Sequence, residues 1–183
     1  MAGVKFVDQT ILERVLENSN ANTIHKTLLR LTNGGVIKRI SNGKYMVTDM
    51  VPDDFEIANY VISPSYISFE TALSYYGILP QFTYSITSAT LNKSNKILFD
   101  QKEMEYTTLN KNLYWGYVKV KEFLIASPEK AAIDTIYMTA KGLRRTDVNE
   151  WDWTAIDKPK FIKYSKIVTF TPFKKFINAN NLI

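Results

Sequence analysis

The sequence predicts an α+β protein in two parts: an N-terminal winged helix-turn-helix over residues 1–50 and a C-terminal mixed α/β domain with an antiparallel sheet over residues 51–183. Three observations lead to this prediction. Two helix patterns precede an Asn-Gly hairpin. An acidic stretch from Asp49 to Asp54, which contains Pro52, reads as a linker, and closely spaced strand patterns follow between further helices.

The composition is that of a folded protein with little room for metal or thiol chemistry. Of 183 residues, 45% are hydrophobic and 22% are charged, which excludes a disordered chain. There is no cysteine and one histidine, His25, so we expect no disulfide, no metal site, no cofactor and no His-dependent triad. The first residues lack the apolar core of a signal peptide and no apolar run reaches about 18 residues, so we expect a soluble, cytoplasmic protein without membrane contact.

Two helices are expected before residue 34. Asp8 is placed to cap the first, whose apolar stripe is Ile11, Leu12, Val15 and Leu16, and Asn18 with Ser19 ends it. The second runs from about residue 20 to 32, and the Asn33-Gly34-Gly35 sequence ends it. At about 100° per residue, this helix has an apolar face with Ala21, Ile24, Leu28 and Leu31. The opposite face is polar and basic and carries Asn22, Thr23, Lys26 and Arg30.

A hairpin and an acid-free basic stretch follow. Residues 36–40 and 45–48 read as strands joined through Asn42-Gly43, a strong hairpin signal. From Ile24 to Thr48 there are five cations and no acid. Helix, turn, helix and hairpin is the order of a winged helix-turn-helix, whose second helix enters the major groove. The expected partner is double-stranded operator DNA, and the expected contacts are Asn22, Thr23, Lys26, Arg30, Lys38, Arg39 and Lys44.

Two alternatives to this interpretation remain open. The basic stretch is also compatible with a solvated helix face, or with a winged helix that docks a protein instead of DNA. Only a short segment precedes Asp8, too little for the first helix of a full winged helix. The module is therefore either minimal or completed by another part of the chain.

The C-terminal part is expected to contain a sheet between helices. Ser68 and Ser127-Pro128-Glu129 read as helix starts, and shorter helices are expected from Pro159 and from Thr171. The strand patterns cover residues 82–90, 96–99, 105–109, 114–120 and 123–126. Because their spacing is too short for helical crossovers, we expect an antiparallel meander.

No enzyme motif stands out, and the prediction is that the protein is not an enzyme. The glycines form neither a dinucleotide-binding nor a phosphate-binding loop. The Asp100-Gln101-Lys102 sequence, together with Asp53, resembles the carboxylates and lysine with which a magnesium-dependent nuclease holds its metal and activates water. That alternative competes with a simpler interpretation, a polar turn after a strand.

Two segments resemble the AbiEi family of antitoxin-like transcriptional regulators. They are residues 66–77, YISFETALSYYG, and residues 125–134, IASPEKAAID, and the residues around Leu28, Gly35 and Gly43 are similar too. The resemblance implies a winged helix that represses its own operon and a C-terminal domain over residues 51–183. It also implies that this domain counters a nucleotidyltransferase-like toxin, without a stable complex, in abortive infection. Both motifs start helices, so they identify no antitoxin contact residue.

Overall fold

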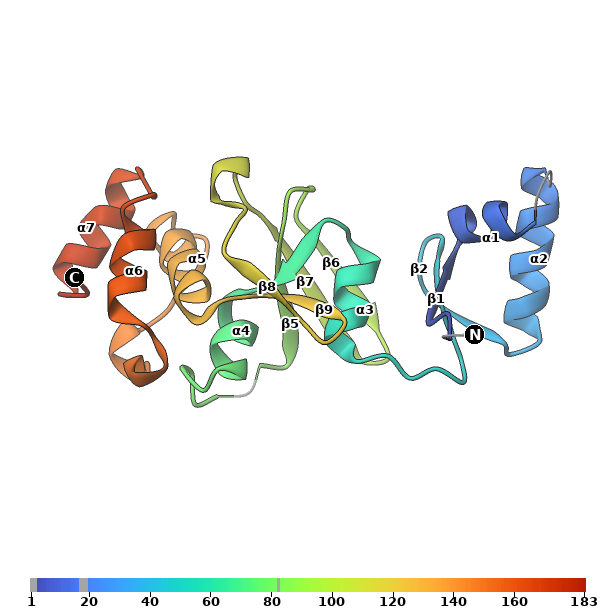
Figure 1. Cartoon of the computed structure of the whole chain (residues 1–183), viewed down its shortest axis with the longest axis horizontal. Coiled ribbons are helices and arrows are strands. Elements are labelled where there is room, and N and C mark those ends of the chain that lie inside the picture. Colours follow the sequence, from blue (N-terminus) through green and yellow to red (C-terminus); the bar gives the residue numbers. More distant parts are fainter. Residues whose placement is uncertain (1–2, 17–19, 82) are drawn as a thin grey trace. The chain divides into compact units, whose positions relative to one another are not determined.

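The computed structural model describes residues 3–16, 20–81 and 83–183. The protein is a mixed α+β protein, as predicted, and divides into two compact units, Met1–Val61 and Ile62–Ile183 (Figure 1). The predicted helix break at Asn18 and Ser19, and Phe82 at the start of a predicted strand, lie outside the described residues.

The first unit is a three-stranded antiparallel sheet with three helices. Its elements are β1 (Phe6–Asp8), α1 (Gln9–Val15), α2 (Ala21–Asn33), β2 (Ile37–Ser41), β3 (Lys44–Val47) and α3 (Asp54–Val61). The strand order is β1-β3-β2, so the first strand pairs with the last. A strand of three residues is too short to show alternation, which is why β1 was not predicted. The buried cluster of this unit contains Val7, Leu12, Ile24, Leu28 and Ile37.

Both predicted helix starts in this unit are confirmed. Asp8 caps α1 by accepting a hydrogen bond from the Ile11 N–H at 3.0 Å. Asn20 caps α2 in the same way, accepting from the Thr23 N–H at 2.9 Å. These side chains satisfy backbone donors that have no partner within the helix, so the boundaries follow from local chemistry.

Helix α3 begins inside the segment that we predicted to be a linker. Its Tyr60 ring stacks on Phe6 with centroids 4.2 Å apart, and the Tyr60 hydroxyl donates to the Val7 carbonyl at 2.8 Å. Glu56 of α3 forms an ion pair with Lys5 at 2.7 Å. These contacts attach α3 to β1, so the first unit ends after Val61 and not after residue 50.

The second unit is built on one six-stranded sheet with the strand order β6-β7-β5-β4-β9-β8 (Figure 1). The strands are β4 (Ser65–Ile67), β5 (Ser85–Thr90), β6 (Asn95–Phe99), β7 (Lys102–Thr108), β8 (Tyr117–Val120) and β9 (Phe123–Ala126). The helices are α4 (Phe69–Tyr75), α5 (Pro128–Ala140), α6 (Lys158–Ser165) and α7 (Thr171–Ala179), with short 3-10 turns η1 (Lys111–Leu113), η2 (Val148–Glu150) and η3 (Trp153–Ala155).

The expected antiparallel meander is wrong, because the sheet is mixed. β4–β5, β6–β7 and β8–β9 are antiparallel, but β5–β7 and β4–β9 are parallel. Strand β6 lies at the edge of the sheet, and β7 lies between β6 and β5. Strand β7 is antiparallel to β6 and parallel to β5. Short spacing agrees with the antiparallel pairs β6–β7 and β8–β9, but it does not show which strand each pair joins.

Helix α5 is the central helix of the second unit. It contacts α4, α6, α7 and β9, and it starts where predicted: the Ser127 hydroxyl accepts a hydrogen bond from the Lys130 N–H at 3.3 Å, and Pro128 follows the cap. Ile133 and Ile136 on this helix are fully buried. In the part of the chain that the structure describes, every helix is too short or too polar to cross a bilayer.

Candidate nucleic-acid interface

Helix α2 has the two faces that the sequence predicts. Ile24 and Leu28 are 2% and 8% exposed, respectively, and belong to the core of the first unit. Asn22, Lys26 and Arg30 are exposed and four residues apart, so they form one row along the helix. We call this row the α2 polar row. It offers a carboxamide, an ammonium and a guanidinium, the groups that pair with base edges and phosphates.

The charges of the α2 polar row are available to a partner. Among the described residues, no acidic side chain forms an ion pair with Lys26 or Arg30. Thr23, the fourth predicted contact on this helix, is exposed at its N-terminal end. The Thr23 hydroxyl is bonded to Asn20 Oδ1 at 3.1 Å and so takes part in the cap. The row therefore presents two cations whose charge is uncompensated within the described protein.

The β2–β3 hairpin adds Lys38 and Arg39, both exposed. The Arg39 side chain folds over the turn: its Nε donates to the Ser41 carbonyl at 3.2 Å, and its Nη2 donates to Asn42 Oδ1 at 3.0 Å. These two bonds hold the guanidinium plane in one orientation, and its remaining N–H donors stay available.

Lys44 is engaged by residues of three elements of the first unit. Its ammonium pairs with Asp8 Oδ2 at 3.3 Å and lies 4.4 Å from the centre of the Tyr60 ring. It thereby connects β3, the cap of α1 and α3 inside the first unit. Burial alone raises the pKa of Asp8, but the hydrogen bonds from the Ile11 N–H and Lys44 outweigh it, so this pKa lies below its usual value. A phosphate at Lys44 would have to compete with this carboxylate.

The two AbiEi-like segments meet in the second unit, in its core. The Tyr66 and Ser68 hydroxyls donate to Asp134 Oδ2 at 2.9 and 2.8 Å, and the Lys130 ammonium pairs with Asp134 Oδ1. Lys130 also lies 4.8 Å from the Trp115 ring centre. We call these residues the Lys130–Asp134 network.

The ion pair of the Lys130–Asp134 network is closed to solvent. The Lys130 and Asp134 side chains are 0% and 1% exposed. Burial raises the pKa of Asp134 and lowers that of Lys130, because it disfavours the charged form of each group. Ser68 was expected to cap α4, but its hydroxyl is bonded to Asp134 instead, and no side-chain cap forms. Tyr66, Ser68, Lys130 and Asp134 therefore act within the core of the second unit.

Of the residues of the nuclease alternative, Asp100 lies in a hairpin turn and Lys102 begins β7. Asp100 and Gln101 have φ of 48° and 66° and form the two-residue connection between the paired residues Phe99 and Lys102. Asp53 belongs to the first unit, where its Oδ1 accepts a hydrogen bond from the Phe55 N–H at 2.8 Å. The described residues contain no group of three His, Asp or Glu side chains able to hold a metal ion. The turn geometry favours the simpler interpretation, a polar turn after a strand.

Comparison with known proteins adds no assignment: no family model matches the chain, and no curated protein matches it. Sequence reasoning found the α2 polar row, because helical periodicity marks it. It missed the pairing of Lys44 with Asp8, because these residues are 36 positions apart and a local sequence pattern does not show such a contact.

Proposed function

We propose that the protein is a transcriptional regulator that binds double-stranded operator DNA through its first unit. The observation that supports this most strongly is the order β1-α1-α2-β2-β3 with the sheet order β1-β3-β2, combined with the α2 polar row. In a winged helix-turn-helix the second helix of the motif enters the major groove, and the hairpin lies over the flanking backbone. Helix α2 and the β2–β3 hairpin take these two places in the proposal.

The proposal gives helix α3 a place in the DNA-binding unit. Helix α3 packs on β1 through Tyr60 and Phe6 and supplies a third helix from the other end of the unit. In the proposal, α3 is the later segment that completes the module.

The residues of the proposed interface divide into two roles. Asn22, Lys26 and Arg30 face the groove, where carboxamides pair with adenine and cations pair with guanine or phosphate. Lys38 and Arg39 hold the phosphates beside the groove. Lys44 acts mainly within the protein, since its ammonium is engaged by Asp8 and Tyr60. The docking-module alternative requires the same face to bind a protein instead.

The test is DNA binding by the full chain, measured by fluorescence anisotropy across a salt series. The probe is a labelled duplex from the region upstream of the coding sequence, and a scrambled duplex is the comparison. Binding that is tighter on the upstream duplex by about a thousandfold or more supports operator recognition. Equal, weak binding to both duplexes contradicts it.

Two double variants identify the surface. Lys26→Ala with Arg30→Ala removes the cations of the α2 polar row, and each lost phosphate contact reduces the salt slope by about 0.9. We therefore expect a slope smaller by roughly 2 and an affinity reduced at least tenfold. Lys163→Ala with Lys175→Ala removes the same charge from exposed positions of α6 and α7, and is expected to bind like the wild type. Equal losses in both variants would contradict a role for α2.

We propose further that the second unit acts as an antitoxin against a nucleotidyltransferase-like toxin, without a stable complex. The support is the AbiEi resemblance, whose two segments form one connected core. The test is co-expression with such a toxin encoded beside this gene. Rescue of growth by the Lys26→Ala, Arg30→Ala variant is expected, because the proposed DNA face is not part of this unit. Failure of both the wild type and the variant to rescue would overturn the antitoxin role and leave the DNA role standing.

A further inference from the structure

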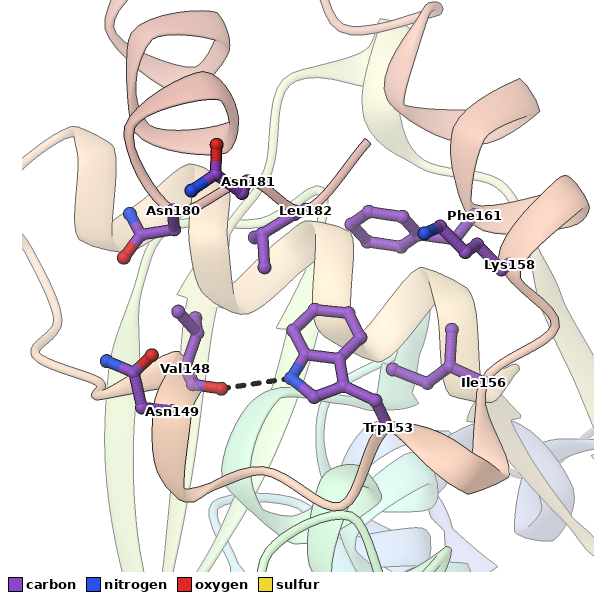
Figure 2. A pocket seen from close by; sticks show the side chains of 9 residues that line it. All are labelled: Val148, Asn149, Trp153, Ile156, Lys158, Phe161, Asn180, Asn181 and Leu182. Atoms are coloured by element: carbon purple, nitrogen blue, oxygen red, sulfur yellow. Dashed lines mark hydrogen bonds between the residues drawn. The ribbon is translucent and has the colours of Figure 1, made fainter.

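The second unit contains a cavity of about 370 Å³ that the proposed function does not use (Figure 2). It lies between the turns η2 and η3, the start of α6 and the residues after α7. Trp153 stands in the middle of the view, three carboxamides (Asn149, Asn180 and Asn181) lie on one side, and Phe161 and Lys158 lie on the other. Such a combination of an apolar body with a few polar groups is typical of small-molecule sites.

The aromatic wall of this cavity is already held in place. The Trp153 indole N–H donates to the Val148 carbonyl at 2.9 Å, as the dashed line in Figure 2 shows. Its ring meets Phe161 edge to face with centroids 5.5 Å apart, and Trp151 lies at 5.4 Å. Because the indole N–H is used within the protein, Trp153 offers a ligand only ring surface. That surface suits a flat, unsaturated ring.

The carboxamide end of the cavity offers hydrogen-bond acceptors. Asn180 Nδ2 donates to the Phe176 carbonyl at 2.8 Å, and Asn149 Nδ2 donates to Asp147 Oδ1 at 2.8 Å. These bonds orient both amides, and among the described residues neither Oδ1 atom accepts a hydrogen bond. An edge with N–H donors, such as the amino and imino groups of a nucleobase, is complementary to this end.

The opposite end favours a negative charge. Among the described residues that line the cavity, Lys158 alone is charged, and it is exposed. An anionic group at this end would be paired with the ammonium, while the ring and its donors occupy the other parts. The volume is near the lower limit of roughly 300–1,000 Å³ for small-molecule sites, which is suited to a small ligand.

We propose that this cavity binds a nucleoside monophosphate, with its base against Trp153, its N–H edge at the carboxamides and its phosphate at Lys158. The inference does not depend on the proposed DNA binding, because it uses none of the residues of the first unit. It assigns a ligand site to a part of the chain that the AbiEi-like motifs do not reach.

The test is isothermal titration of the full chain with AMP, GMP, CMP and UMP, with the matching nucleosides, and with inorganic phosphate. We expect at least one monophosphate to bind one to one with a dissociation constant below about 1 mM. Lys158→Gln is expected to weaken that monophosphate about tenfold and to leave its nucleoside unchanged. Lys163→Gln, on the same helix but outside the cavity, is the control and is expected to bind like the wild type.

The Lys26→Ala, Arg30→Ala variant separates this site from the basic face of α2, and its nucleotide affinity is expected to equal that of the wild type. Absence of saturable binding by all four monophosphates would overturn the proposal. An equal loss of nucleotide affinity in Lys158→Gln and Lys163→Gln would also overturn it. So would inorganic phosphate that binds as tightly as the monophosphates, because this would indicate an anion site without base recognition.

Discussion

The Lys130–Asp134 network allows a quantitative test of whether the AbiEi-like motifs are structural. Lys130→Met keeps a long, unbranched side chain but removes the charge that faces Asp134. Both side chains are at most 1% exposed, so the carboxylate would remain buried with only the Tyr66 and Ser68 hydroxyls as donors. Breaking one partner of a buried ion pair costs about 3–5 kcal/mol, and we expect that loss in the free energy of unfolding of the second unit.

The double variant Lys130→Met, Asp134→Asn should recover most of this loss. The amide retains an acceptor for the two hydroxyls, and neither site then carries a charge, so we expect stability within about 1.5 kcal/mol of the wild type. The single variant should also approach the wild type in acid. Without Lys130, the folded-state pKa of Asp134 rises further above its unfolded value, so the deficit shrinks as the pH falls through that folded-state pKa.

The assay is urea unfolding followed by tryptophan fluorescence. Trp115, Trp151 and Trp153 all belong to the second unit, so the signal reports this unit alone. A loss below about 1 kcal/mol in Lys130→Met, or no recovery in the double variant, would refute the reasoning. A stable Lys130→Met protein without antitoxin activity would instead assign the motif a direct role in function.

Three further predictions concern single residues. Asp8→Asn keeps the cap but removes the charge facing Lys44, so we expect a loss of about 0.5–1 kcal/mol at pH 7. The folded-state pKa of Asp8 lies below its unfolded value, so the stability difference between wild type and variant should vanish as the pH falls through the folded-state pKa. Thermal unfolding at several pH values measures this. Tyr60→Phe removes the hydrogen bond to the Val7 carbonyl and should destabilise the first unit by about 1 kcal/mol. The assay is denaturant unfolding followed by circular dichroism, and an unchanged stability would argue against α3 completing this unit. Gln101→Gly should stabilise the second unit by about 1 kcal/mol in urea, since glycine adopts φ of 66° without strain; a loss would show that Gln101 makes a needed contact.

The features found from the sequence are those governed by neighbouring residues. The helix start at Asn20, the buried positions of Ile24 and Leu28, and the start of α5 at Ser127 were all predicted and are present. Caps act on backbone groups two or three positions away, and helical periodicity repeats within four. A single sequence contains all the information that such interactions need.

Other features depend on residues that are far apart in the chain. Lys44 meets Asp8 across 36 positions, and Tyr66 meets Asp134 across 68. The parallel pairing of β5 with β7 and the attachment of α3 to β1 likewise result from packing between distant segments. The same lysine pattern can be a free surface cation or an internal ion pair. The sequence by itself therefore determined the basic face of α2 and the local element boundaries. The tertiary structure decided which cations remain available, how the strands are ordered and where a cavity forms, because these depend on which distant side chains are brought into contact.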